Sequence, residues 1–192
     1  MTPRISLLFI FAVVSALATS IANADEPTKK DPALKVGSEL PFVVVDFAVG
    51  PHKGHCGCPS VMISNHDARG LVIWSRTADD ATMRLAAAAE DKVDGKKTHG
   101  YLVVFDTPEE KLAAQVKTGE WKNMTIGTSR HSSQEEFARR GLDPKVAYAV
   151  FLVDRKEIKS LWSLRAAELT KEKADAILKD ATAFLKPAPE RK

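Results

Sequence analysis

The chain has 192 residues, with 28 basic and 25 acidic side chains and a formal net charge of +3. Because these charges are interspersed, no face collects enough of them to indicate nucleic-acid binding. The length and the 44% hydrophobic content suit one domain with a buried core.

The first 24 residues have the pattern of a secretory signal peptide. Arg4 supplies the positive start, residues 5–18 are almost continuously apolar, and Ala22-Asn23-Ala24 is a small-x-small cleavage site. The apolar stretch is too short to span a bilayer comfortably. We therefore expect an exported chain, in the periplasm or outside the cell, which begins at Asp25, keeps no membrane span and retains 168 of the 192 residues.

The rest of the sequence predicts one folded domain between two polar ends. Residues 25–35 are polar and contain proline, as in a flexible leader, and residues 187–192 form a basic, proline-containing tail. We expect the domain itself over residues 36–186.

The first half of this domain predicts a strand and a hairpin. Residues 42–49 are β-branched and aromatic, which favours a strand. Residues 60–64 alternate, and residues 71–74 form a continuous apolar run typical of a strand covered on both faces. Paired as a hairpin, residues 60–64 and 70–76 would place Cys58 opposite the region of Arg76. That is the carboxyl end of the central strand, where open α/β sheets gather their chemistry.

The second half of the domain alternates helices with strands. Capping residues begin the helices: Asp79 or Asp80, Thr107 followed by Pro108, Ser132, and Thr170. The expected elements span residues 79–92, 101–105, 107–117, 123–127, 132–141, 146–153, 158–164 and 170–185. Their alternation predicts parallel strands with right-handed crossovers, and the hairpin near the end makes the sheet mixed.

The strongest chemical signal is the loop of residues 50–59, which holds both cysteines of the chain, Cys56 and Cys58. With only Gly57 between them, they cannot staple distant parts of a fold. A disulfide across so small a ring would be strained and therefore easily reduced. His52, Lys53 and His55 would favour the thiolate form, so we expect Cys56, next to His55, to attack and Cys58 to resolve.

Two other interpretations use the same loop. His52, His55, Cys56 and Cys58 offer two imidazoles and two thiolates, a ligand set that suits copper or zinc in a non-catalytic module. Ligands this close in sequence rarely close a tetrahedral site alone, so the metal reading ranks below the redox reading. The third interpretation is an inert pair on a fold that only binds partners.

The order of elements resembles the thioredoxin-like superfamily, in its exported thioredoxin or peroxiredoxin-like variants. The resemblance rests on the strand and following residues 71–76, on the strand, turn and returning strand over 150–158, and on Glu168-Leu169-Thr170 before an amphipathic helix. It implies an α/β three-layer sandwich with a mixed central sheet flanked by helices. It further implies thiol–disulfide exchange without a cofactor, with protein thiols or disulfides held in a groove near Trp74, Arg76, Ala147 and Tyr148.

The sequence departs from this family at two places. Thioredoxins carry Cys-x-x-Cys after the central strand, and peroxiredoxins carry their reactive cysteine there, whereas this chain has residues 76–80 without a thiol. Thioredoxins also place a cis-proline before the strand that faces the cysteines, and here Pro144 comes slightly early. The displaced Cys56/Cys58 pair is therefore the candidate that remains for redox chemistry.

Overall fold

The computed structural model describes residues 33–116 and 121–186. Within these ranges the chain forms a seven-stranded mixed sheet, in the order β2-β1-β5-β4-β3-β6-β7, and five α-helices. The strands are β1 (Val45–Val49), β2 (Cys56–Gly57), β3 (Arg69–Ser75), β4 (Thr98–Val104), β5 (Met124–Ser129), β6 (Tyr148–Asp154) and β7 (Glu157–Leu164). The helices are α1 (Pro59–Asn65), α2 (Asp80–Glu90), α3 (Glu109–Gln115), α4 (Ser133–Arg139) and α5 (Lys171–Leu185), with a short 3₁₀ turn at Ala166–Glu168.

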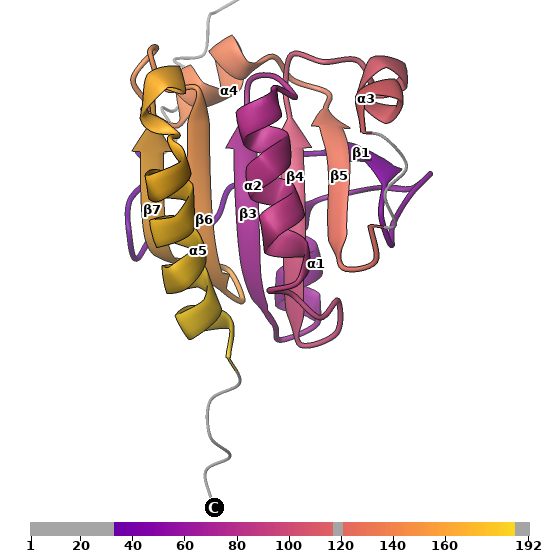
Figure 1. The fold of residues 1–192 in the computed structure, drawn as a ribbon, viewed down its shortest axis with the longest axis vertical. Helices are drawn as coiled ribbons and strands as arrows, with labels where there is room; N and C mark the ends of the chain where they lie inside the picture. The colour runs from indigo at the N-terminus through magenta and orange to yellow at the C-terminus, as the bar shows by residue number, and fades with distance from the viewer. Residues whose placement is uncertain (1–32, 117–120, 187–192) are drawn as a thin grey trace, which may run out of the picture.

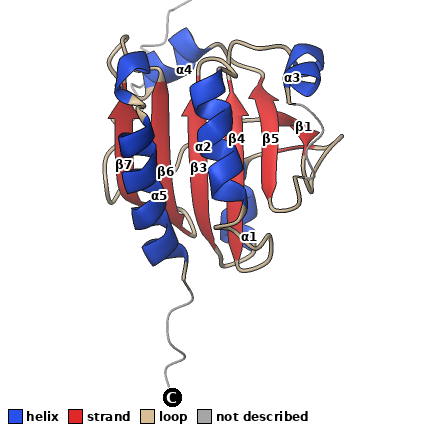
Figure 2. Cartoon of the chain, in the orientation of Figure 1, coloured by secondary structure: helices blue, strands red, loops and turns tan. Residues whose placement is uncertain are grey.

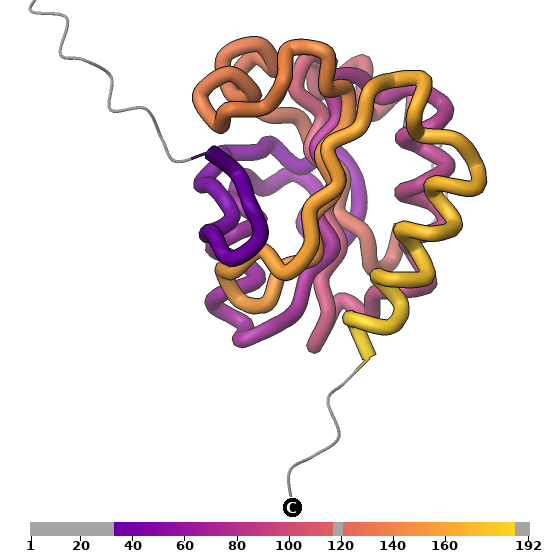
Figure 3. Tube along the Cα trace, turned by 90° about the vertical axis from the view of Figure 1, so that its left-hand side faces the viewer, coloured from indigo at the N-terminus to yellow at the C-terminus, as the bar shows by residue number. Residues whose placement is uncertain are grey.

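The elements form three layers, as predicted. Helices α2 and α5 cover one face of the sheet, in front of the strands in Figure 1. Figure 2, coloured by secondary structure, shows the same helices lying along the strands. Turned by 90°, Figure 3 shows α2 and α5 on one side of the sheet and the N-terminal segment and α4 on the other.

Strand β3 is the central strand that the apolar run 71–74 predicts. It pairs parallel with β4 and antiparallel with β6, so both of its edges are covered. Five residues of this strand, 71 to 75, are essentially inaccessible to solvent. The parallel β3-β4-β5 unit and the final β6–β7 hairpin confirm the predicted mixed sheet.

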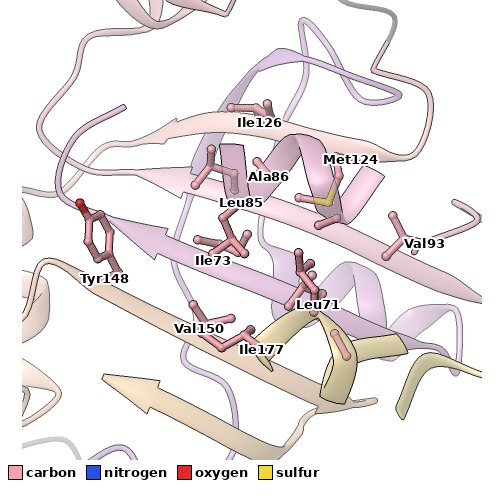
Figure 4. Close-up of a cluster of buried hydrophobic side chains, with 14 of the residues drawn as sticks. Leu71, Ile73, Leu85, Ala86, Val93, Met124, Ile126, Tyr148, Val150 and Ile177 are labelled. Carbon is pink, nitrogen blue, oxygen red and sulfur yellow. The ribbon is translucent and has the colours of Figure 1, made fainter. Parts of the chain in front are cut away.

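Each face of the sheet has its own hydrophobic cluster. Alternate residues of β3 point to opposite sides, because successive side chains of a strand do so. Leu71 and Ile73 pack with α2 and α5, in the cluster drawn in Figure 4. Val72 and Trp74 pack on the opposite face with Phe137 of α4 and Ile63 of α1.

The predicted helix starts are largely confirmed. Asp79 accepts a hydrogen bond from the Thr82 N–H (2.8 Å), and Ser132 and Thr170 cap α4 and α5 in the same way. The start of α3 differs by one residue. Pro108, rather than Thr107, is its N-cap, and the Thr107 carbonyl accepts from the Thr128 hydroxyl (2.6 Å).

The predicted hairpin over residues 60–76 is wrong, because residues 59–65 form helix α1. Pro59 stands at the first helical position, where its missing N–H costs nothing and its fixed φ suits the helix. Ile63 of α1 then packs against the bare backbone of Gly70. The antiparallel partner of β3 is β6, with Ser75 opposite Tyr148, so Cys58 does not lie opposite Arg76.

No helix within the described ranges has both the length and the apolar character needed to cross a membrane.

Candidate functional site

The cysteine pair lies where the edge strand β2 leads into helix α1. Cys56 and Gly57 form β2, which pairs antiparallel with β1, with Asp46 opposite Cys56 and Val45 opposite Gly57. The loop before β2 ends in a β-bulge, in which the Gly54 N–H donates to the Phe47 carbonyl (2.8 Å) and the Phe47 N–H donates to the His55 carbonyl (2.9 Å). Gly54 has φ +79°, a conformation that glycine adopts without strain. This bulge fixes the direction in which Cys56 points.

Cys56 is exposed and carries a free thiol. Its cross-strand neighbour Asp46 forms a two-pronged ion pair with Arg130, at 2.8 Å and 2.7 Å. The hydrogen bond from Arg130 holds the pKa of Asp46 below its usual value, despite some desolvation. Arg130 also interacts electrostatically with Cys56, so this arginine lies within reach of charge that develops on the sulfur.

Cys58 is free but buried, at 4% exposed. It is the N-cap residue of α1 and has extended backbone angles. Its Sγ accepts a hydrogen bond from the Val43 N–H (3.4 Å) and lies 3.1 Å from the Ser60 hydroxyl oxygen. The two cysteines therefore differ sharply: one thiol meets solvent, and the other is held by groups of the protein.

Cys56 is displaced sideways from the end of the central strand. The end of β5 pairs with β1 at Val45 opposite Ser129, so β2 lies toward the edge where the parallel strands finish. However, β1, β5 and β4 separate β2 from β3. At roughly 4.8 Å per strand, the backbone of Cys56 is about 19 Å from that of β3.

The carboxyl end of β3 is occupied by Arg76 and its hydrogen bonds. The guanidinium donates to the carbonyls of Val146 (2.7 Å) and Pro144 (3.0 Å) and to the Ser133 hydroxyl (2.8 Å). It also lies over the Phe137 ring, 4.9 Å from its centroid. The loop before β6 is thus tied down by an arginine, at the place where thioredoxins carry their reactive cysteines.

Two further hydrogen-bonded groups close this end of the sheet. The Tyr148 hydroxyl donates to the Asp79 carboxylate (2.6 Å), and burial together with this bond raises the pKa of Tyr148. Ser133 donates through its hydroxyl and, at 2.8 Å, through its N–H to Asp106. These paired side chains make a structural network at the position.

The structure brings some of the predicted residues together and separates others. Arg76, Ala147 and Tyr148 meet at the end of β3, where the Arg76 N–H donates to the Ala147 carbonyl (3.1 Å). Trp74 is 1% exposed and packs among phenylalanines, so it does not line an open groove. All four belong to β3, β6 or the residues that adjoin them, and three strands separate β3 from the strand that holds Cys56.

The proposed metal ligands are not gathered around a common point. Within residues 33–116 and 121–186, no group of three or more histidine, cysteine, aspartate or glutamate side chains could hold a metal ion. His52 instead packs its ring against Phe47 and Tyr101, at centroid distances of 5.9 Å and 6.3 Å. Its ring is therefore turned to the sheet rather than toward Cys56.

A row of rings beside α1 was not predicted from the sequence. It runs from Phe47 through His52, Tyr101 and His99 to His66, with neighbouring centroids 5.1–6.3 Å apart. His99 and Tyr101 are buried, and neither His99 Nε2 nor the Tyr101 hydroxyl has a hydrogen-bond partner in the described structure. Burial is the main cause of a lowered pKa at His99, and the electrostatic effects of His66 and then His52 lower it further. Alternate residues 99 and 101 of a strand share one face, which is the only sequence signal that links them.

Comparison with known proteins shows that this chain is similar to several of them in fold. No family model matches the chain, and no curated protein matches its sequence. Among solved structures, it is similar to a candidate protein disulfide isomerase from Bacteroides thetaiotaomicron, at 15% identity and a TM-score of 0.57, covering 80% of this chain and 92% of that chain.

Two further structures give the same result. A peroxiredoxin-like protein from Aquifex aeolicus has 15% identity and a TM-score of 0.53, over 81% of this chain and 90% of that chain. The thioredoxin domain of a thiol-disulfide oxidoreductase from Bacteroides vulgatus has 16% identity and a TM-score of 0.50, over 78% and 99%. The chain therefore has the thioredoxin-like fold that its sequence predicts, without the thiol at the end of the central strand.

Proposed function

We propose that this protein is an exported thiol–disulfide oxidoreductase that acts through Cys56 and Cys58. The observation that carries the proposal is the unequal pair itself: an exposed thiol and a buried thiol, two residues apart and both free. An exposed sulfur can meet a substrate disulfide, and a buried neighbour is protected from solvent until the first exchange has occurred.

In this proposal the exchange follows two balanced steps. The Cys56 thiolate attacks one sulfur of a substrate disulfide, forms a mixed disulfide and releases the other substrate sulfur as a thiolate. The Cys58 thiolate then attacks the Cys56 sulfur, so the protein gains a Cys56–Cys58 disulfide and the substrate leaves with both thiols reduced. The proposal assigns the thiol proton to the imidazole of His55, which precedes Cys56 in the chain and is exposed. The reverse sequence oxidises a substrate dithiol, and neither direction requires a cofactor.

Trapping the mixed disulfide tests this assignment. The Cys58→Ser chain, exposed to a disulfide-bonded protein substrate, should accumulate a covalent adduct at Cys56, because the resolving thiol is gone. The Cys56→Ser chain should form no adduct while it remains folded. Mass spectrometry of the two variants measures both outcomes. An adduct found only at Cys58, or a wild-type pair that no dithiol can reduce and no disulfide can oxidise, would contradict the proposal.

Export is the second part of the proposal and rests on residues 1–24, which lie outside the described residues. Cleavage after Ala24 would give a mature chain that begins at Asp25. N-terminal sequencing of the protein recovered from its native compartment tests this start. An intact Met1 on the folded protein would contradict it.

A partner-binding domain without catalysis is the second candidate, and the Arg76 network favours it. Where relatives of this fold carry thiols, this chain has an arginine bound to two carbonyls and a hydroxyl. A chain with both Cys56→Ser and Cys58→Ser should then bind its partner as tightly as the wild type. Loss of binding in that variant favours the oxidoreductase.

A further inference from the structure

Strand β2 is an edge strand, and the role inferred for its free edge rests on the proposed function. In an antiparallel pair, opposite residues alternate between exchanging both backbone hydrogen bonds and exchanging none. Phe47 exchanges both bonds with the bulge at Gly54 and His55, so the next pair, Asp46 and Cys56, is of the non-bonded kind. The N–H and C=O of Cys56 therefore point away from β1.

These two backbone groups face outward from the last strand of the sheet. β2 is the terminal strand in the order of the sheet, and it pairs with β1 alone in the described part of the chain. An unpaired N–H and C=O on a border strand form a ready template for another extended chain. Here the template is the backbone of the exposed cysteine itself.

The Cα separation of such a pairing agrees with that of a disulfide. Two residues that exchange both hydrogen bonds in an antiparallel ladder have Cα atoms about 5.5 Å apart. Disulfide-bonded cysteines have Cα atoms about 5.5–6 Å apart. Their side chains also leave the same face of the ladder, which brings the substrate sulfur to the side of Cys56. The Cβ atoms of such a pair lie about 5.5 Å apart, against about 3.5–4.5 Å in a relaxed disulfide, so the two chains must draw slightly closer as the sulfurs bond.

The surroundings of β2 favour an extended polypeptide over a compact small molecule. Phe42 is 62% exposed and directly precedes Val43, whose N–H binds Cys58, and Val61 of α1 is 38% exposed. With Val36, they are the large exposed apolar side chains of the described residues. Lys53, which is exposed, gives the loop a positive charge that suits an acidic segment.

We propose that β2 binds its substrate as an added antiparallel strand, an extended polypeptide segment whose oxidised cysteine pairs directly with Cys56. The backbone of Cys56 donates to and accepts from the substrate cysteine, while Phe42 and Val61 contact apolar neighbours of that cysteine. The substrate class is therefore a disulfide in an unfolded or loop segment, with acidic and apolar residues beside it.

The test uses the Cys58→Ser chain and a nine-residue peptide rich in valine and glutamate, whose central cysteine is joined to 2-mercaptoethanol by a disulfide. Attack by Cys56 on the peptide sulfur forms the protein–peptide disulfide and releases mercaptoethanol. A second peptide carries an N-methyl group on the cysteine nitrogen, which removes the bond to the Cys56 carbonyl. A third carries it on the next residue, whose N–H points away. Each rate is divided by the rate of the same peptide with free glutathione.

We expect methylation at the cysteine to slow the exchange about 3- to 10-fold, as for one lost hydrogen bond, and methylation of the next residue to change it less than about 2-fold. Phe42→Ala should lower the rate of exchange with the peptide by a similar factor. Val36→Ala, which lies beside β7 at the other edge of the sheet, should not. Equal rates for the three peptides would overturn strand addition.

A small disulfide separates this failure from failure of the proposed function. Hydroxyethyl disulfide makes no strand, so it should react with Cys56 at the same rate in the wild-type and Val36→Ala backgrounds. If it reacts and the peptides show no backbone dependence, strand addition alone is wrong. If Cys56 reacts with neither, the oxidoreductase proposal and strand addition both fail.

Discussion

His99 is a buried base that the fold keeps neutral. It is 6% exposed, and its Nε2 has no hydrogen-bond partner in the described structure. Its neighbours His66 and His52 are imidazoles, so they offer no negative charge that would stabilise a protonated His99. Asp94 opposes the shift but does not reverse it, so the pKa of His99 remains lowered. Tyr101, beside it, has its pKa raised by burial and then by Cys58, so it stays protonated in the same pH range.

This environment makes stability depend on pH. Unfolded histidine takes up its proton near pH 6.5, and folded His99 does so only at lower pH. Between these values the unfolded chain binds more protons, so the free energy of unfolding falls as pH drops below about 6.5. Urea unfolding at pH 7.5 and at pH 5.5 measures the fall. The His99→Gln chain should show a smaller fall than the wild type.

The exposed His131 provides the control for that experiment. His131→Gln should leave the pH dependence of the wild type unchanged, because the substitution alters only an exposed side chain. A His99→Gln chain with an undiminished fall would show that other groups cause it.

Cys56 and Cys58 should also differ in their access to reagents. Iodoacetamide applied to the folded, reduced chain should modify Cys56 and leave Cys58 unmodified, because only the first thiol is exposed. In urea both should react. Peptide mapping by mass spectrometry identifies the modified residue, and equal labelling of both cysteines in the folded chain would contradict the burial of Cys58.

At the scale of elements, one carboxylate joins α2 to β5. Glu90, the last residue of α2, accepts hydrogen bonds from the backbone N–H groups of Lys122, Asn123 and Met124, all at 2.7–2.8 Å. The Asn123 side chain donates in turn to the Glu90 carbonyl (3.2 Å). This one residue therefore fixes where β5 begins.

Glu90→Ala should lower the free energy of unfolding by about 2–3 kcal/mol, because it removes charge-assisted bonds and leaves backbone donors unpaired. Asp180→Ala, at an exposed position of α5, should change it by less than about 0.5 kcal/mol. Urea titration of both variants measures the difference. Equal effects of the two substitutions would mean that solvent replaces the bonds of Glu90 at no cost.

Gly127 sets how closely β1 approaches β5. A methyl group at this position would lie 2.4 Å from the Asp46 carbonyl oxygen, a backbone atom that cannot move alone. Gly127→Ala should therefore push β1 and β2 away from the sheet, at a cost of about 1–3 kcal/mol. Compared with the wild type, the variant should show faster hydrogen exchange at residues 45–47, and the increase should be larger there than in β3. Unchanged protection of β1 in the variant would contradict this close approach.

The sequence predicts most elements correctly because their signals are local. Side-chain caps at Asp79, Ser132 and Thr170 can be read from a few neighbouring residues, and the apolar run at 71–74 identifies the strand with two covered edges. Residues 59–65 lack such a signal, since one alternating pentapeptide fits a strand or one face of a short helix. Pro59 at the first helical position favours the helix, and Ile63 packing on Gly70, a contact made by the folded chain, adds to that preference.

For the whole molecule, helix α1 changes where the candidate redox cysteines lie. Without the hairpin, Cys56 lies in β2, four strand positions from β3, and Cys58 is the N-cap of α1. Sequence reasoning found both thiols, but it could not place them, because the partner of a two-residue strand is set by long-range pairing. Arg130 and Asp46 were missed for the same reason: 84 residues separate them in the chain.

The separation of the two regions can be tested with Arg76. Arg76→Leu removes donors to two carbonyls and a hydroxyl, and it should lower the free energy of unfolding by about 2–4 kcal/mol. The alkylation rate of Cys56 should stay within about 2-fold of the wild type, because Cys56 lies about 19 Å from β3. Urea titration and thiol labelling give the two values. A large fall in the rate for a chain that is still folded would show that both regions form one site.

The pairing of β3 between β4 and β6 also has a consequence for biosynthesis. A chain made from its N-terminus exposes the apolar residues 71–74 long before β6, at Tyr148–Asp154, exists to cover them. At about 5–20 residues per second, that interval is roughly 4 to 15 seconds. The nascent polypeptide thus keeps one edge of β3 exposed for a large part of its translation, and a chaperone that holds it unfolded would find its target there.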